Sequence, residues 1–454
     1  MKKRFIYLIL SSLTAAGAGA LMGLDTRQII IALIFSSSIF GTLFFWDFRL
    51  SFVFLGSGLL LTINAVELED FLRYASLDVI LFLIGMMIIV GMMKESGFFY
   101  WFVTEILRIK KLTGIRLFAG LAVVSAVLSG LMGEVTSIMI MTAVILDICM
   151  FFEVRPTPLI ISSVMATNVG SAATLLGNPV GILIAARGKL SFEDFLLRGL
   201  PVSIIVLAAT IAIMIFWFRK YIGELDEKLK AHADNKGFFY LISIPPDRKT
   251  KISMMIFGAT VLLMAFHKRI EALAGVHENT LLMMLPVISA GIVMLYRHDK
   301  ARYYIEREVE WQSILFFMFL FAQAGVIQSS GIAAALAQKM LDVVNAKKAL
   351  AATVLFSSGF FSSILDNVVV VASYVPVIRN MNIADKGLLW WALLFGGCYG
   401  GNVTMIGSSA NIVALGILEK KTNYRVSFGE WLKLGAVVGA ASAFISILMM
   451  WLFF

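Results

Sequence analysis

Cysteine, histidine and charged residues are scarce in this chain of 454 residues. Its two cysteines, Cys149 and Cys398, both lie within apolar stretches, and its four histidines are scattered in loops or at expected helix ends. These counts exclude a disulfide framework and offer no pair of metal ligands. The chain also lacks a His-Glu-x-x-His pattern, a Gly-x-Ser-x-Gly pattern and a phosphate-binding loop. We therefore expect neither an enzyme nor an ATP-driven pump, and no organic cofactor.

Apolar residues are abundant instead. They make up 60% of the chain, charged residues only 15%, and the mean hydropathy is +0.90. This composition is typical of an all-α polytopic membrane protein whose partner is the lipid bilayer. The formal net charge of +9 raises the alternative of nucleic-acid binding. We interpret it as topology information, because Lys and Arg lie in short clusters between apolar runs rather than on one basic face.

The N-terminal segment admits two interpretations. MKKRFIYLILSSLTAAGAGA has the order of basic, apolar and small residues that a signal peptide has. We prefer a retained first helix, because many apolar runs follow it. The cluster Lys2, Lys3 and Arg4 then holds the N-terminus in the cytoplasm.

The apolar runs predict about eleven transmembrane helices plus two re-entrant hairpins. We divide the chain into four parts: an extra N-terminal transmembrane helix (1–28), a first repeat (29–218), a basic cytoplasmic linker (219–251) and a second repeat (252–454). Alternating crossings then put the N-terminus in the cytoplasm and the C-terminus outside. The expected location is the inner, or plasma, membrane.

Interrupted apolar segments occur twice in each repeat. Residues 113–152 are about twice as long as one helical span, and residues 349–378 have a polar centre, so each is predicted to form a hairpin. Glycine, proline and small polar residues break the apolar runs at 159–187 and 388–418, where we expect two half-helices with an unwound stretch between them.

These segments are also related in sequence. LSGLMGEVTSIM (128–139) aligns with FSSILDNVVVVA (361–372), and GSAATLLGNPVGI (170–182) aligns with GGNVTMIGSSANI (400–412). The alignment puts Gly133 opposite Asp366 and Glu134 opposite Asn367. The two halves are predicted to be inverted, because corresponding spans cross in opposite directions. Paired broken segments in inverted repeats indicate the binding site of a secondary transporter.

Glu134 and Asp366 are the two carboxylates that we expect deep in the membrane. A charge there costs roughly 2.5–3.5 kcal/mol on insertion scales, so it is usually functional. One explanation is that each carboxylate caps the N-terminus of a half-helix by accepting backbone N–H bonds. The other is that the pair binds a cation or a proton. The two roles are compatible.

Amides and hydroxyls accompany the breaks. We expect the five asparagines among them to bind an ion or substrate, because a buried asparagine without a partner is costly. The small residues Ala172, Ala173 and Ser409 are explained by close helix packing alone. The polar set comprises Asn168, Ser171, Thr174, Asn178, Asn367, Asn402, Thr404, Ser408, Ser409 and Asn411.

Three stretches carry a family resemblance: SLDVILFLIGMMIIVGMMKESGFFYW, SSILDNVVVVASYVPV and GGNVTMIGSSANIVALGILEK. Together they resemble the ion transporter superfamily, in particular its arsenite-permease and sodium/proton-antiporter branch, which is related to the divalent anion:sodium symporters. The resemblance covers about residues 70–218 and 305–454. It implies two inverted repeats, a scaffold that often forms a homodimer, and hairpins and broken helices that move in an elevator manner.

The resemblance also implies site residues. By matching motif positions, ion and substrate binding falls on Glu134, Thr136, Asn168, Thr174, Asn178, Asp366, Asn367, Asn402, Thr404, Ser408 and Asn411. A sodium ion would use Glu134, Asp366, Asn367 and Asn402. One departure is that the branch usually carries an Asp-Asn pair in both tips, whereas the first tip here reads Gly133-Glu134.

We therefore expect a secondary active transporter of a small inorganic ion or small anion, coupled to Na⁺ or H⁺. Sodium/proton antiport is favoured, because two acidic tips suit a cation and repel an anion. Arsenite or antimonite efflux is the first alternative. A sodium-coupled carboxylate or inorganic anion transporter is disfavoured because no arginine accompanies the breaks. A channel and a non-transporting membrane scaffold or receptor are the alternatives from other classes.

Overall fold

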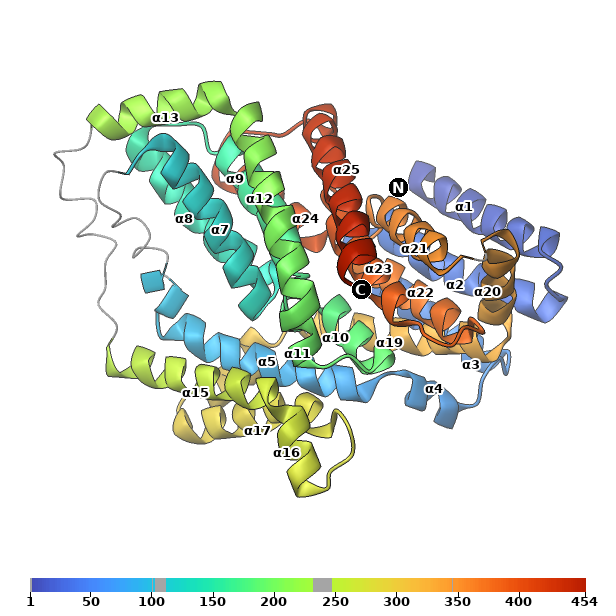
Figure 1. Ribbon diagram of the computed structural model, residues 1–454. Coiled ribbons are helices and arrows are strands. Elements are labelled where there is room, and N and C mark those ends of the chain that lie inside the picture. The colour runs from blue at the N-terminus through green and yellow to red at the C-terminus, as the bar shows by residue number, and fades with distance from the viewer. Residues whose placement is uncertain (1, 100, 103–111, 232–246, 345) are drawn as a thin grey trace.

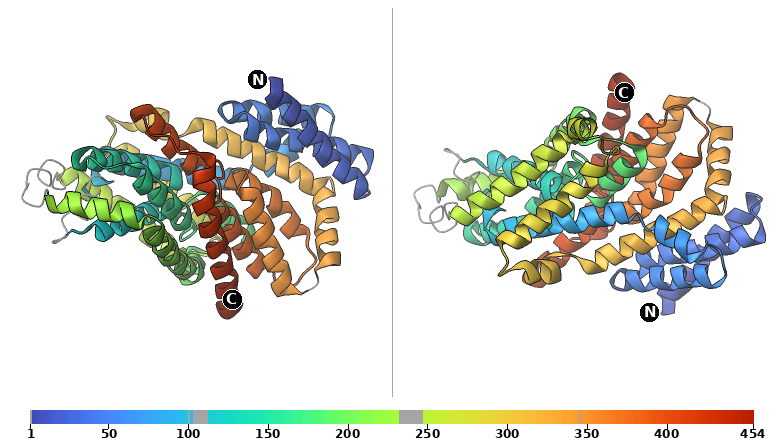
Figure 2. Two further views of the ribbon diagram at one scale, coloured as in Figure 1. Left: turned by 90° about the horizontal axis from the view of Figure 1, so that it is seen from above. Right: turned by 90° about the horizontal axis from the view of Figure 1, so that it is seen from below.

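The computed structural model describes the chain except for residues 1, 100, 103–111, 232–246 and 345. Throughout this described part, the regular elements are helices (Figure 1). The predicted all-α membrane fold is confirmed. Helices α1 (Lys2–Leu21) and α2 (Thr26–Phe44) lie at one end of the molecule, and α13 (Arg219–Ala231) lies at the opposite end (Figure 2).

Eight helices in the described ranges are long and apolar enough to cross a membrane. They are α1, α2, α5 (Leu77–Glu95), α7 (Gly114–Met132), α8 (Glu134–Phe152), α19 (Trp311–Ser329), α25 (Phe428–Phe453) and a continuous stretch of α11 (Phe192–Asp194), η2 (Phe195–Gly199) and α12 (Leu200–Trp217). A ninth is formed if α15 (Arg248–Ala265) and α16 (His267–Ala274), bent by 67°, count as one span.

This count differs from the eleven expected spans for a physical reason. Two of the eight helices, α7 and α8, are the arms of the first expected hairpin. Four expected spans are made of shorter helices: α3 (Arg49–Thr62), α17 (Thr280–Tyr296) and the two broken helices. Each broken run is divided by its unwound centre, so neither piece reaches the length of a full span.

The breaks fall within the expected segments. The first broken helix consists of α9 (Thr157–Gly170) and α10 (Pro179–Gly188), and the second of α23 (Gly387–Gly400) and α24 (Ser409–Lys421). The second hairpin is α21 (Lys347–Ser362) and α22 (Asn367–Asn380). Only Gly133 separates α7 from α8, so the first hairpin consists of two arms of 19 residues each.

The two halves pack in the same way. Hairpin arm α7 packs against α9, and α21 packs against α23, while α12 and α25 lie against each other between the two hairpins (Figure 1). At equivalent positions of these contacts, a Cβ atom on Gly170 would collide with the backbone of Ala126, and one on Gly400 with that of Gly359. Glycine therefore allows each broken helix to approach its hairpin closely.

A second group of helices surrounds this pair of halves. Helix α5 crosses α17 so closely that Gly85 faces the backbone of Pro286, and α19 packs against α3, α4 (Leu68–Tyr74) and α22. The lower part of Figure 1 shows α5, α15 and α17 side by side. We call α3, α5, α17 and α19 the supporting helices.

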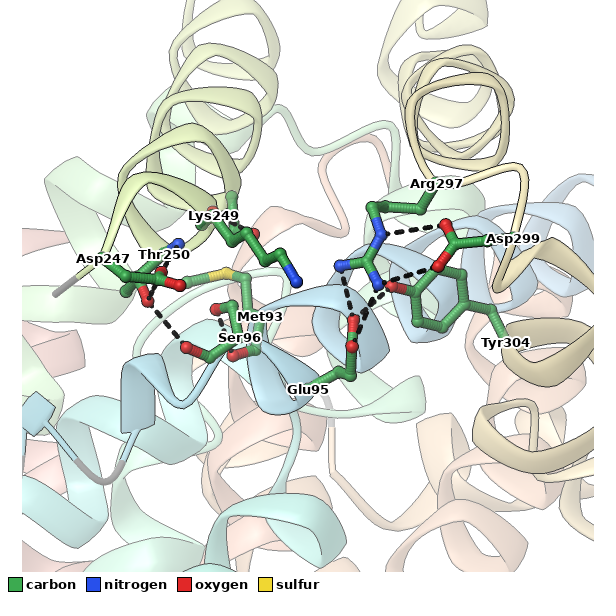
Figure 3. Close-up of polar contacts among 10 residues, drawn as sticks. Met93, Glu95, Ser96, Asp247, Lys249, Thr250, Arg297, Asp299 and Tyr304 are labelled. Carbon is green, nitrogen blue, oxygen red and sulfur yellow. Dashed lines mark hydrogen bonds and ion pairs between the residues drawn. The ribbon is translucent and has the colours of Figure 1, made fainter. Parts of the chain in front are cut away.

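Polar contacts fasten the end of α5 to its neighbours (Figure 3). Arg297, which follows α17, donates to both carboxylate oxygens of Glu95 at 2.9 and 3.1 Å, and the Tyr304 hydroxyl donates to the same carboxylate at 2.8 Å. On the other side, Thr250 Oγ1 donates to the Ser96 carbonyl oxygen at 2.6 Å. Bidentate arginine–carboxylate geometry is the strongest form of such a contact, so α5, α15 and α17 are held together at one end.

The predicted linker begins as a helix. Residues 219–231 form α13, which buries Tyr221, Ile222, Leu225 and Leu229 and packs against α7 and α8. Asp226 accepts the Gly114 backbone N–H at 2.9 Å at the start of α7. Residues 232–246 of the linker, with its proline pair, lie outside the described residues, and α15 begins at Arg248.

Candidate functional site

The two hairpin tips meet in the interior of the protein. Glu134 is the first residue of α8, and Asn367 is the first residue of α22. Asn367 Nδ2 donates to Glu134 Oε1 at 3.0 Å and to Oε2 at 3.2 Å. Glu134 is 4% exposed and Asn367 1%. Two equivalent positions of the alignment are thus joined by a buried hydrogen bond to a carboxylate, which is stronger than one between neutral groups.

Asp366 caps the second hairpin arm and also reaches the neighbouring broken helix. Its Oδ1 accepts the Val368 backbone N–H at 3.0 Å, and its Oδ2 accepts the Ser409 hydroxyl at 2.6 Å. This carboxylate lies close enough to Glu134 for two negative charges to repel each other. A buried pair of carboxylates that repel favours the uptake of a cation or a proton between them.

These contacts separate the two explanations of the carboxylates. Asp366 is a helix cap, whereas the N-cap position of α8 is Gly133 and the Glu134 carboxylate bonds to a side chain of the other half. They also correct the assignment of Ser409 to packing alone. Its position in the first turn of a half-helix, beside Ser408, is the signal that could have identified it.

The asparagines of the two breaks form a second cluster. Asn168, near the end of α9, donates through Nδ2 to Oδ1 of Asn402 at 2.8 Å and of Asn411 at 2.9 Å. Its own Oδ1 accepts the Ser408 hydroxyl at 3.0 Å. Asn402 also donates to the Met165 carbonyl oxygen at 3.2 Å. These side chains come from opposite halves, so the unwound stretches are joined directly to each other.

Asn411 and Asn178 each satisfy the backbone of their own break. Asn411 Nδ2 donates to the carbonyl oxygens of Gly401 and Thr404 at 2.8 and 2.9 Å. Asn178 accepts the Gly181 backbone N–H at 2.8 Å as the N-cap of α10. An irregular backbone at membrane depth needs such partners, because no solvent is available to supply them.

Asn178 links its break to the other half as well. Its Nδ2 donates to Ser171 Oγ at 2.9 Å and to Cys398 Sγ at 3.1 Å, at the end of α23. Cys398 is 1% exposed. Its position in an apolar stretch gave no sign of a polar contact, because a cysteine is normal in such a stretch.

Thr174 and Thr404 tie each broken helix to the hairpin of its own half. Thr404 Oγ1 donates to the Ser363 carbonyl oxygen at 2.5 Å, and Thr174 Oγ1 donates to the Gly130 carbonyl oxygen. The alignment makes the two donors equivalent, and likewise the two acceptors. The structure therefore repeats the same tether in both halves.

A cavity of about 450 Å³ opens beside the tips, between them and the supporting helices. Its polar lining includes Arg49, Glu134, Thr136, Asn178, Glu308, Glu310, Ser313 and Ser409, and apolar side chains from α5 and α19 complete it. Thr136 thus lies on the cavity wall. Glu308 also pairs with Lys94 at 2.9 Å.

Arg49 is the functional candidate that sequence reasoning missed. It begins α3, donates to Ser313 Oγ at 3.0 Å and lies over the Trp46 ring at 4.3 Å. Asp366 and Glu310 are near enough to interact with its charge. The argument that no arginine accompanies the breaks is therefore wrong for the folded protein. Its place at the start of a short span, far from either hairpin in the chain, carried no signal.

In this protein two helical hairpins meet at their tips between two broken helices, beside an open cavity. This arrangement is typical of a membrane transporter. Residues 42–396 match the family described as citrate transporter (CitMHS). The chain therefore belongs to the citrate transporter family, within the superfamily that the motifs predicted.

Individual relatives agree with this class. The chain is 33% identical over 383 residues to an "uncharacterized transporter" of Mycobacterium tuberculosis, covering 83% of this chain and 86% of the relative. It is 25% identical over 426 residues to an "uncharacterized transporter" of Synechocystis, covering 88% and 92%. It is also 26% identical over 443 residues to the human "P protein", covering 81% of this chain and 52% of that protein.

Proposed function

We propose that this multi-pass transporter is a secondary active antiporter of the inner, or plasma, membrane that exchanges Na⁺ for H⁺. The observation that carries the proposal is the contact between the two tips. Glu134 and Asp366 are both buried, Asn367 next to Asp366 in the chain bonds to the Glu134 carboxylate, and Glu134 lines an open cavity. Either a proton or a cation can neutralise this pair, so the two compete for one site. Competition at an alternately exposed site gives exchange without ATP.

The charges around the cavity support a cation as the transported species. Its lining carries three carboxylates, Glu134, Glu308 and Glu310, against Arg49 and the Lys94 partner of Glu308. Asp366, behind Ser409, adds a further carboxylate. An excess of negative charge around a cavity attracts cations and repels anions. Of the four residues expected to bind Na⁺, three lie at the tips and Asn402 lies in the cluster of the breaks.

The predicted topology, with the N-terminus in the cytoplasm, makes this cavity the inward entrance. The cavity is bounded on one side by the tips and α10, and on the other by α5 and the start of α19. Movement of the hairpins and broken helices against the supporting helices would close this entrance and open one on the opposite face. We propose this elevator movement as the transport step.

A second candidate is sodium-coupled transport of a small carboxylate. Arg49 favours it, because a guanidinium on the cavity wall binds carboxylates in a fixed geometry, and the family as a whole is described as citrate transporters. In this function the acidic tips would hold the coupling Na⁺ and Arg49 the anion.

The test is a proteoliposome panel with an imposed pH gradient and Na⁺, Li⁺, K⁺, arsenite, citrate or a dicarboxylate as the second solute. We expect Na⁺ movement coupled to H⁺. Asp366→Asn should reduce it at least about 10-fold, the effect of losing one hydrogen-bonded charge. Arg49→Gln should retain gradient-driven Na⁺ exchange.

Two outcomes would change the assignment. Gradient-coupled citrate uptake that Arg49→Gln abolishes would replace the antiporter by the carboxylate transporter. Steady ionic current through the purified protein in a planar bilayer, without coupling, would contradict both and indicate a channel.

A further inference from the structure

A second cavity, of about 240 Å³, lies at the other ends of α5, α10 and α19. Three arginines line it: Arg73 at the end of α4, Arg187 at the end of α10 and Arg379 at the end of α22. Ser76 and Gln328 add polar atoms, and the described residues that line it include no carboxylate. We call it the arginine cavity. It shares no described lining residue with the central cavity.

Two of the three guanidinium groups, those of Arg187 and Arg379, have weak partners. Arg379 Nη1 reaches Gln328 Oε1 only at 3.5 Å. Arg187 donates to Ser76 Oγ at 2.5 Å, but its ion pair with Asp78 is long, at 3.4 Å.

Arg73 pairs with Glu69 and Asp70 at 3.3 and 3.4 Å, where both carboxylates face solvent. Arg187 and Arg379 lie close enough for their charges to repel each other. Like charges held around a cavity attract an anion, and guanidinium groups match the oxygens of carboxylates, sulfate and phosphate in geometry.

The residues that line the arginine cavity come from both sides of the expected movement. Arg187 lies on α10, whose N-cap is Asn178, and Arg379 lies on α22, whose N-cap is Asp366. Ser76 and Gln328 belong to the start of α5 and the end of α19. A ligand in the arginine cavity would therefore touch the helices that carry the central site and the helices that support them.

We propose that the arginine cavity binds a small anion bearing carboxylate, sulfate or phosphate oxygens, separately from the central site. The predicted topology puts it on the outer face. The bound anion ties α10 and α22 to α5 and α19. If the elevator movement proposed above takes place, on which this part of the inference rests, the anion slows it by holding the outer end closed.

Binding can be measured without any transport assay. The full-length protein in phosphatidylcholine nanodiscs is titrated with sulfate, phosphate or succinate by calorimetry, and its thermal unfolding is followed at constant ionic strength maintained with chloride. We expect saturable binding that raises the unfolding midpoint. Arg379→Gln should raise the dissociation constant at least about 10-fold, because one charged hydrogen-bond donor is lost. Arg379→Lys should raise it less.

Three control variants locate the site. Arg49→Gln removes the arginine of the central cavity, Asp366→Asn alters the tips, and Arg302→Gln removes an arginine whose side chain is 88% exposed. All three should bind sulfate as the wild type does. Asp366→Asn distinguishes the two proposals, because it should lose ion exchange and keep anion binding. The inference is overturned by absence of sulfate binding in the wild type, or by loss in Arg49→Gln together with full binding in Arg379→Gln.

A lipid headgroup could supply the same phosphate chemistry. The titration is therefore repeated in nanodiscs that contain phosphatidylglycerol. Unchanged sulfate binding there supports an anion from solution. The other result is sulfate binding that is present in phosphatidylcholine and lost in phosphatidylglycerol. If Arg379→Gln removes both the binding and its sensitivity to phosphatidylglycerol, the site is supported and its occupant is lipid phosphate.

Discussion

The carboxylate of the first hairpin tip lies one position later than that of the second tip, and the structure shows the consequence. Gly133 and Glu134 stand where the second tip has Asp366 and Asn367, and it is the second residues of the two pairs that meet. An Asp-Asn pair in both tips would bring two amides together there. In this chain Asn367 instead donates to a carboxylate. The displaced acid therefore places negative charge at the contact between the halves, while Asp366 keeps its bonds to Val368 and Ser409.

Glu134→Gln tests this charge. Glutamine keeps the size of the side chain and can accept a hydrogen bond from Asn367. It carries no negative charge, so it cannot take up a proton or pair with a cation. We expect gradient-driven exchange in proteoliposomes to fall about 10- to 150-fold, which corresponds to about 1.5–3 kcal/mol for a hydrogen bond to a charged group. Glu419→Gln, which changes an exposed carboxylate on α24, is the matched control. Equal exchange in both variants would remove Glu134 from the site.

The first hairpin depends on the conformation of one residue. Gly133 has φ = +93° and is all that separates α7 from α8. Because this backbone region is unfavourable for residues with a Cβ atom, only glycine allows a reversal this short. The second hairpin turns over four residues, 363–366, and needs no such residue. The two tips therefore place equivalent side chains side by side by different backbone routes.

Gly133→Ala should lower the free energy of unfolding by about 1–2 kcal/mol through backbone strain. A Cβ atom at this position has no neighbour within 4 Å, so a steric clash is not the cause. Gly258→Ala in the middle of α15 also has open space, but it has helical backbone and should stabilise the protein by about 0.5–1 kcal/mol. Denaturant unfolding in detergent measures both. A stabilising effect of both substitutions would contradict the strain.

Polar and charged contacts fasten α5, α15 and α17 at their ends, which the predicted topology puts outside the membrane. Hydrogen bonds from Arg297 hold the pKa of Asp299 below its usual value, and the Thr250 backbone N–H does the same for the pKa of Asp247 (Figure 3). A lowered pKa in the folded state means that the stabilisation is complete above the pKa of an unfolded aspartate, about 3.9, and is lost as the pH falls through the lower folded value.

This linkage predicts how an aspartate variant behaves. Asp299→Asn should unfold at a lower temperature than the wild type above pH about 5. The difference should start to shrink below pH about 4 and close as the pH falls through the lower pKa of Asp299 in the folded protein, where the wild-type carboxylate is protonated too. Thermal unfolding in detergent across this pH range measures the difference. A difference that is constant with pH would show that Asp299 acts through packing rather than charge.

Much of the architecture was predictable, because it depends on local properties of the chain. The lengths of apolar runs predicted the helices, and clusters such as TNVGSAATLLGNPVG predicted where they break, because glycine, proline and buried polar residues interrupt a helix wherever it packs. Six of the eleven expected spans are long apolar helices, one is the bent pair α15 and α16, and four are short or divided helices. The first hairpin was predicted over 113–152, and its two arms meet at Gly133, within the stretch LSGLMGEVTSIM that the alignment singled out.

The sequence by itself determined that this protein is helical and apolar, has two related interrupted halves and carries two acidic tips. Tertiary structure alone decided that Glu134 meets Asn367, that Asn168 bridges Asn402 and Asn411, and that Arg49 faces the central cavity. It also decided that Arg187 and Arg379 share a second cavity. The physical reason is that hydropathy and helix breaks act over one or two turns of the chain, whereas these contacts join residues from separate elements and depend on how the halves pack.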